Sequence, residues 1–242
     1  MRGCWSVLHN LFCFLQGEML MKIFRLIIVF GALTLWAFSQ ASAAQDDEDV
    51  QSWNDVQITV PMSKKVDYFN KVTMRFGKNI SRLNDGRFAV GFVWKPTKAL
   101  SISPFYWYIN ARNAAGNFRI ENRLNLAVIY RFPPLGKGFG LSHRSTFERR
   151  LRHSGDTWRY RAMMTVDKDI PKHIIPNAKW FVADEVFYDS ATKKFSRNRC
   201  SMGITKIISK QLSVDLYYTR QNDGFSHPGD LNIIWAAWKI KL

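Results

Sequence analysis

Residues 118–132 read FRIENRLNLAVIYRF, and this stretch decides the fold. Its apolar side chains occupy alternate positions on one face: Phe118, Ile120, Leu124, Leu126, Val128, Tyr130 and Phe132. The opposite face carries Arg119, Glu121, Arg123, Asn125 and Arg131. A period of two is typical of a β-strand, whose successive side chains point to opposite faces. The strand is also long, since strands of soluble proteins usually have about five or six residues, and this length suits a tilted crossing of a bilayer.

The same alternation recurs along the chain and predicts an all-β protein. The candidate strands are 51–61, 66–78, 86–96, 99–112, 117–132, 138–152, 157–168, 178–189, 194–207, 210–221 and 231–242. Aromatic residues stand near strand ends, where membrane interfaces favour amphipathic rings: Trp94, Tyr130, Phe132, Trp158, Tyr188 and Trp238. The prediction is an up-and-down antiparallel transmembrane β-barrel with short connections.

The strand count needs one adjustment. Eleven segments qualify, but bacterial single-chain barrels have even numbers of strands, so we expect ten or twelve. The segment 99–112 is the least clear, because Phe105, Tyr106, Trp107 and Tyr108 are adjacent and both faces look apolar. Its inward face is not decided by the sequence.

The N-terminal part differs from the rest. Residues 21–25 are basic, residues 26–38 are apolar but too few to span a bilayer comfortably, and Ala41-Ser42-Ala43 fits a cleavage site. We therefore expect a signal peptide at 21–43, with 1–20 as an extension that is not translated. An acidic leader at 44–50 and the barrel at 51–242 follow, located in the outer membrane of a Gram-negative cell.

Charge and cysteine content limit the partners. The formal net charge is +16, which in an exported protein favours outer-membrane lipids, lipopolysaccharide or small anionic solutes over nucleic acid. The barrel-assembly machinery is the other expected partner. Cys200 is the one cysteine after residue 20, so we expect no disulfide, no metal site and no cofactor.

Several charged motifs carry a resemblance to a known family. They are Trp53-Asn54-Asp55-Val56, Arg119-x-Glu121-Asn122-Arg123-Leu124, Arg144-x-x-x-Glu148-Arg149-Arg150, Trp158-Arg159-Tyr160-Arg161, Glu185 and Asn198-Arg199. With them the chain resembles, over residues 51–242, the bacterial outer-membrane β-barrel family known as domain of unknown function 2490. The resemblance implies the fold and the location, and it assigns no activity.

The inward face is expected to hold a charge network. Its members are Arg119, Glu121, Arg123, Arg144, Glu148, Arg150, Arg159, Arg161, Glu185, Arg197 and Arg199, with Asp167 and Asp215 among the acids. One interpretation is a set of ion pairs that stabilises a narrow lumen, because unpaired buried charge is costly. The other is an electropositive, porin-like channel that passes or binds small anions. Both interpretations can hold together.

His143 and Ser145 are weak candidates for catalysis. They lie two residues apart, hence on the same face of one strand, and that face points to lipid. Lipid A deacylases and phospholipases of the outer membrane use such a pair, so a lipid-modifying hydrolase is one alternative. A triad also needs a group that orients the histidine, and we find no outward acid at a convincing offset on the neighbouring strand. We expect a structural or narrow-pore role rather than an enzyme. A soluble periplasmic barrel that binds an apolar ligand is the last alternative.

Overall fold

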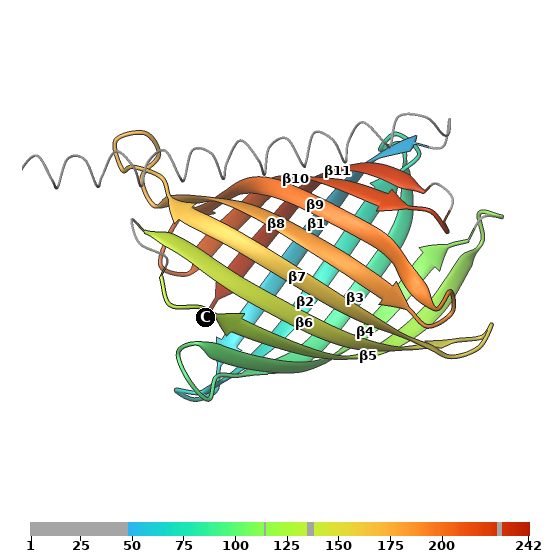
Figure 1. Ribbon diagram of the computed structural model, residues 1–242, viewed down its shortest axis with the longest axis horizontal. Helices are drawn as coiled ribbons and strands as arrows, with labels where there is room; N and C mark the ends of the chain where they lie inside the picture. Colours follow the sequence, from blue (N-terminus) through green and yellow to red (C-terminus); the bar gives the residue numbers. More distant parts are fainter. Residues whose placement is uncertain (1–47, 114, 135–137, 227–228) are drawn as a thin grey trace, which may run out of the picture. The chain divides into compact units, whose positions relative to one another are not determined.

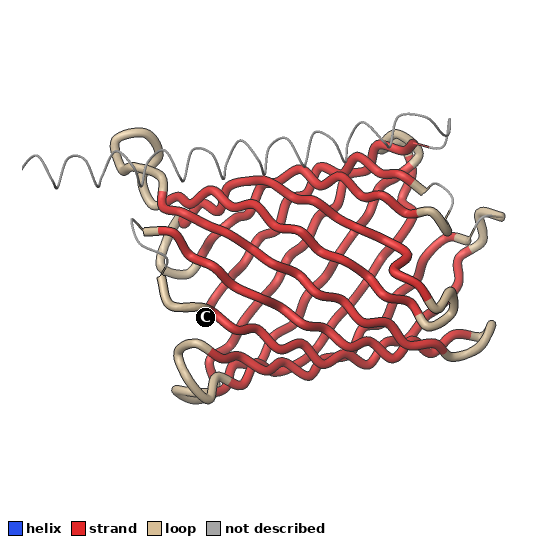
Figure 2. Tube along the Cα trace, viewed as in Figure 1, coloured by secondary structure: helices blue, strands red, loops and turns tan. Residues whose placement is uncertain are grey.

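The computed structural model describes residues 48–113, 115–134, 138–226 and 229–242, which form a β-barrel (Figure 1). The predicted signal peptide and the segment 1–20 lie outside these residues. The strands are β1 (Glu48–Pro61), β2 (Val66–Gly77), β3 (Arg82–Trp94), β4 (Leu100–Arg112), β5 (Phe118–Arg131), β6 (Phe139–Arg152), β7 (Thr157–Asp169), β8 (Ala178–Asp189), β9 (Lys194–Ile207), β10 (Leu212–Asp223) and β11 (Asp230–Lys241). Figure 2 shows them as long tilted strands that wrap around the barrel.

The barrel closes with an odd number of strands. Each strand pairs with its sequence neighbours, and β1 pairs with β11 to complete the ring. The expectation of ten or twelve strands is therefore wrong, because all eleven predicted segments are strands. With an odd number the first and last strands run in the same direction, so β1 and β11 are parallel from Glu48↔Asp230 to Thr59↔Lys241.

The odd count gives the barrel two distinct mouths. The amino mouth contains the start of β1 and the turns that follow even-numbered strands. The carboxyl mouth contains Leu242 and the turns that follow odd-numbered strands, and the label C in Figure 1 marks it. The start of the chain's first strand and the end of its last strand thus lie at opposite mouths.

β1 begins earlier than expected. It starts at Glu48, three residues before the predicted boundary of the barrel. The Asp49 carboxylate accepts hydrogen bonds from the backbone N–H groups of Lys78 (3.0 Å) and Asn79 (2.8 Å). These contacts fix the β2–β3 turn, where both residues have positive φ. The end of the acidic leader is therefore part of the strand.

The two faces of the sheet are the reverse of those of a soluble protein. Large apolar side chains point outward and are exposed, among them Leu124, Met202, Leu216 and Ile234, whereas charged side chains such as Glu148 are buried in the lumen. An apolar exterior around a charged interior is the arrangement of a transmembrane barrel, so the soluble alternative is set aside. Among the described residues there is no helix long and apolar enough to cross a membrane.

The structure also assigns the inward face of β4. Ser101, Ser103 and Ile109 are buried, whereas Pro104 and Tyr108 on the other face are exposed. Phe105 and Trp107 share the parity of the serines and face the lumen. The sequence left this face open because aromatic side chains occur on both sides of the strand.

Candidate functional site

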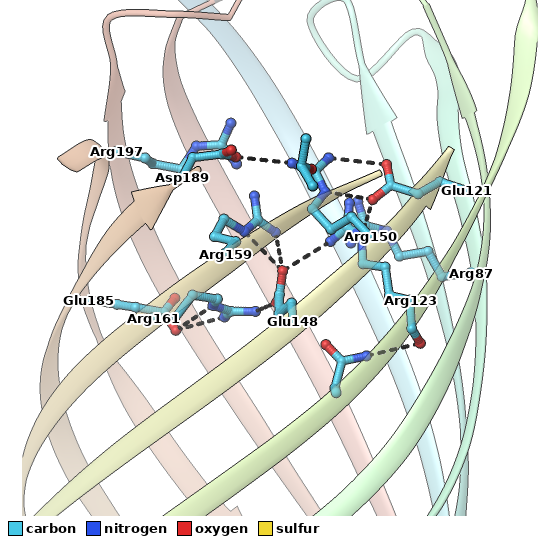
Figure 3. Close-up of polar contacts among 12 residues, drawn as sticks. Arg87, Glu121, Arg123, Glu148, Arg150, Arg159, Arg161, Glu185, Asp189 and Arg197 are labelled. Carbon is cyan, nitrogen blue, oxygen red and sulfur yellow. Dashed lines mark hydrogen bonds and ion pairs between the residues drawn. The ribbon is translucent and has the colours of Figure 1, made fainter. Parts of the chain in front are cut away.

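A belt of charged side chains crosses the lumen in the half of the barrel nearer the amino mouth (Figure 3). We call it the charge belt. None of its side chains is more than 32% exposed. Among the described residues it comprises nine arginines and six acids joined by ion pairs: Arg75, Arg87, Arg123, Arg144, Arg150, Arg159, Arg161, Arg197 and Arg199 with Asp85, Glu121, Glu148, Glu185, Asp189 and Asp223.

Glu148 on β6 is the centre of the belt. It is 2% exposed, and its two oxygens accept hydrogen bonds from Arg159 (2.6 Å) and Arg161 (2.7 Å) on β7. Arg161 also donates to Glu185 on β8 at 2.6 Å, and Arg144 donates to the same Glu185 oxygen at 3.0 Å. Each carboxylate thus accepts hydrogen bonds from two arginines, and this sharing joins three neighbouring strands.

A second centre lies at Glu121 on β5. Arg150 binds it through two nitrogens, at 2.6 and 3.0 Å, and Arg123 donates to it at 2.5 Å. Arg150 also reaches Asp189 on β8 at 3.1 Å. Charge-assisted and bidentate contacts of this kind are the stronger hydrogen bonds in proteins, so this part of the belt is well satisfied.

The belt has more cations than anions, and two arginines carry the looser contacts. The shortest carboxylate distances are 3.9 Å from Arg75 to Asp85 and 4.0 Å from Arg199 to Glu185. Nε of Arg199 instead donates to the neutral Gln221 at 2.8 Å. Nε of Arg75 is buried and has no hydrogen-bond partner among the described residues. The surplus positive charge is thus concentrated at these two guanidinium groups.

Aromatic rings inside the barrel support the unmatched cations. Arg75 Cζ lies 3.4 Å from the centroid of the Trp53 ring, and Arg199 Cζ lies 4.9 Å from the same ring. Phe187 on β8 has four belt guanidinium groups around it at 4.8–5.6 Å, those of Arg159, Arg161, Arg197 and Arg199. Cation–π contacts are worth more where the cation is desolvated, so these rings help the barrel retain surplus charge in its interior.

The structure brings together ten of the eleven residues predicted for the network. The exception is Arg119, which is exposed at the start of β5, where no ion pair of the belt includes it. Sequence reasoning missed five members: Arg75, Arg87, Asp85, Asp189 and Asp223. Arg75 and Arg87 alternate with the apolar residues of β2 and β3, so the parity that identified the other arginines was available for them too.

The two other predicted lumen acids lie outside the belt, toward the carboxyl mouth. Asp215 accepts a hydrogen bond from Lys239 at 2.5 Å, and Asp167 accepts one from Lys179 at 3.2 Å. The lysines are about half exposed. Lys179 also pairs with Asp169 at 3.4 Å, so these cations do not outnumber the acids that they contact, in contrast to the belt.

His143 and Ser145 lie on the outer face of β6 and are hydrogen-bonded. Nε2 of His143 is 2.9 Å from the Ser145 hydroxyl, which is 2.8 Å from the hydroxyl of Tyr160. Nδ1 of His143 lies 3.2 Å from Sδ of Met164. The serine and imidazole are therefore in contact as predicted from their spacing, but a thioether occupies the place where a triad has a carboxylate or amide.

An outward acid exists two strands away from the histidine. Met164 on β7 is the register partner of His143 on one side and of Asp184 on the other. Asp184 is exposed on β8 and accepts a hydrogen bond from Asn198 at 2.7 Å. Because Met164 lies between them, Asp184 does not orient His143.

Comparison with known proteins gives the family. The model of the family described as protein of unknown function (DUF2490) matches residues 50–232, nearly the whole barrel. The chain belongs to this family. This DUF2490 protein is also 25% identical over 201 residues to an uncharacterised protein of Methylorubrum extorquens. The aligned region covers 80% of this chain and 87% of that protein.

Solved structures similar to this DUF2490 protein are barrels. The NanC porin has a TM-score of 0.48 and 11% identity, with 80% of this chain and 99% of that chain covered. The anion-selective porin from Comamonas acidovorans has a TM-score of 0.38 and 10% identity, with 74% of this chain covered. The chain spans about half (54%) of the length of that porin.

Proposed function

We propose that this protein is exported by the signal peptide at 21–43 and forms a barrel in the outer membrane. Small anionic solutes pass through the lumen of this barrel. One observation carries the proposal: the charge belt holds nine arginines against six carboxylates, joined by the ion pairs described above. A belt that served stability alone would gain from equal numbers, because every unmatched buried charge costs free energy. Outer-membrane lipids, lipopolysaccharide and the barrel-assembly machinery are its proposed macromolecular surroundings.

The burial of the belt sets the kind of passage. Glu148, Arg159 and Arg199 are each under 10% exposed, so the lumen is filled by side chains at this level. A solute can cross there only by exchanging with existing ion pairs. Low conductance with a preference for anions is therefore the expected behaviour, since arginine-lined constrictions favour anions electrostatically.

Planar bilayers test the proposal directly. Under a potassium chloride gradient, the purified barrel is expected to give small conductance steps. Its reversal potential should have the same sign as the equilibrium potential of chloride. Arg199→Gln should shift this potential toward zero. Arg149→Gln is the matched control, because Arg149 faces outward and pairs with exposed Asp156, and it should leave the potential unchanged. A membrane that stays silent, or cation selectivity, would refute the proposal.

The contact between His143 and Ser145 supports a second candidate function, a lipid-modifying hydrolase. The imidazole can accept the hydroxyl proton across the 2.9 Å contact as Oγ attacks an ester carbonyl. The ester bond then breaks, the leaving alcohol takes the proton, and water hydrolyses the acyl-serine to release the fatty acid. The pair faces the lipid in which such esters are found. Nδ1 of His143 contacts the thioether of Met164 and not an orienting acid, which places this candidate behind the first.

An assay of fatty-acid release tests the hydrolase. Barrel in vesicles of phospholipid, and separately of lipid A, should release free fatty acid, and Ser145→Ala should abolish the release. Ser142→Ala is the matched control, since Ser142 lies on the same strand but on the lumen side. Equal rates for the wild type and Ser145→Ala would exclude the hydrolase.

A further inference from the structure

Four aromatic side chains form a continuous track on one wall of the lumen. We call it the aromatic ladder. The ring centroids are 5.5 Å apart between Phe181 and Tyr217, 4.9 Å apart between Tyr217 and Trp235, and 4.7 Å apart between Trp235 and Trp53. The members come from β8, β10, β11 and β1, so the ladder crosses the parallel seam.

The register aligns the ladder. Trp53 is paired with Trp235, Trp235 with Tyr217, and Tyr217 with Gly203, which is paired in turn with Phe181. A side chain on Gly203 would have its Cβ 2.2 Å from Cβ of Tyr217. The glycine therefore leaves the space in which the rings on β8 and β10 meet across β9.

The ladder leads from the carboxyl mouth to the charge belt. Phe181 is the fourth residue of β8 counted from that mouth, whereas Trp53 is the sixth residue of β1 counted from the amino mouth. Phe181, Tyr217 and Trp235 are partly exposed, and Trp53 is buried. A solute entering from the carboxyl mouth thus meets accessible rings first and the buried end of the ladder last.

The surplus guanidinium groups lie at the inner end of the ladder. Arg75 and Arg199 both contact the Trp53 ring, at 3.4 and 4.9 Å. These are the two belt arginines whose carboxylate contacts are loose, and one of them has an unsatisfied buried Nε. A row of rings that ends at two under-paired cations is complementary to a solute with a flat apolar face and a carboxylate.

We infer that the lumen binds cyclic carboxylates, with the ring of the solute on the aromatic ladder and its carboxylate at Arg75 and Arg199. Aromatic faces provide large apolar contact, and guanidinium groups bind carboxylates by charge-assisted, often bidentate, hydrogen bonds. A sugar acid and an aromatic acid share this chemistry. The inference rests on the proposed uptake of anions and specifies its solute class.

A second aromatic pair in the barrel gives a matched control. Phe69 and Phe105 meet across Gly91 with centroids 6.0 Å apart, in the same way that Tyr217 and Phe181 meet across Gly203. Among the cation–π contacts of the described residues, those of the belt arginines involve Trp53, Trp235 and Phe187 rather than this pair. If ring pairs across a glycine acted only to pack the sheet, substitution of either would affect solute binding equally.

Calorimetric titration of the detergent-solubilised full barrel tests the inference, with glucuronate, benzoate, acetate and glucose as probes. At least one cyclic acid is expected to bind about tenfold more tightly than acetate, with glucose weaker still. Preference for glucuronate assigns the sugar acid as the solute, and preference for benzoate assigns the aromatic acid. Equal binding of acetate and both cyclic acids would overturn the inference.

Variants separate the two halves of the site. Tyr217→Leu should reduce the preference for the cyclic acid over acetate, Arg199→Gln should weaken both acids, and Phe105→Leu should change neither. The heat-dependent gel mobility of each variant verifies folding, and the comparison of probes on the wild type stands without any variant. If the barrel conducts anions selectively but does not prefer cyclic acids, the role of the aromatic ladder is refuted and the proposed transport stands. If the bilayer stays silent but cyclic acids bind preferentially, transport is refuted and the role of the ladder stands.

Discussion

Glu148 on β6 accepts a 2.7 Å hydrogen bond from Arg161 on β7, although the register places Arg159, not Arg161, opposite it. The contact is diagonal across the strand pair. Arg161 continues in the same direction to Glu185 on β8. Diagonal ion pairs connect positions at different heights of neighbouring strands, so they resist sliding of one strand along the next as well as separation.

Substitution of the belt's central acid should destabilise the barrel strongly. Glu148→Gln removes the charge that faces Arg159 and Arg161 and leaves both guanidinium groups buried and under-paired, a loss on the order of 3–5 kcal/mol. Urea unfolding in lipid vesicles measures it. Asp156→Asn is the control, because its pair with Arg149 is about half exposed and is worth about 0–1 kcal/mol. Similar losses for the two variants would contradict the belt's stabilising role.

The alternating sequence predicted every strand and most of the charge belt, because parity assigns a face without knowledge of the partner strand. The aromatic ladder could not be predicted in this way. Trp53 and Trp235 lie in the first and last strands and meet only because β1 and β11 pair to close the barrel in this register. Tyr217 and Phe181 meet only through the register of β9. Contacts between strands depend on register, which a pattern within one strand does not contain.

Asp184 is expected to reduce the stability of the barrel in lipid. It lies in the middle of the outward row of β8, between Trp180 near one end and Tyr188 near the other, and its neighbours in that row are valines. A lipid-facing charge at mid-strand is unfavourable, so Asp184→Val should stabilise the barrel by about 1 kcal/mol. Urea unfolding in bilayers of matched thickness measures this, with exposed Asp169→Asn near the carboxyl mouth as the control. Destabilisation by Asp184→Val would indicate that a polar partner covers this face.

The parallel seam predicts where tags will be accessible. The turn at 190–193 lies at the amino mouth and Leu242 at the carboxyl mouth. An epitope inserted in that turn and one appended after Leu242 should therefore be reached from opposite sides of the membrane, so that intact cells expose one of them to antibody. In an even-stranded barrel both would lie on the same side. Labelling of both epitopes on intact cells would contradict the parallel pairing of β1 with β11. Labelling of neither epitope before the cells are lysed would also contradict it.

Gly203→Ala should destabilise the barrel more than an alanine at another glycine of the sheet. Its Cβ would lie 2.2 Å from Cβ of Tyr217 and 2.4 Å from the carbonyl oxygen of Leu216, and backbone atoms cannot yield as a flexible side chain does. We expect a loss of about 1–3 kcal/mol, as for other overpacked sites, together with weaker discrimination of cyclic acids because the rings on either side must separate. Gly86→Ala is the matched control, since a Cβ there meets nothing within 4 Å. Unfolding midpoints in urea compare the two variants, and a loss at Gly86 equal to that at Gly203 would show that the cost comes from glycine itself and not from the ring contact across β9.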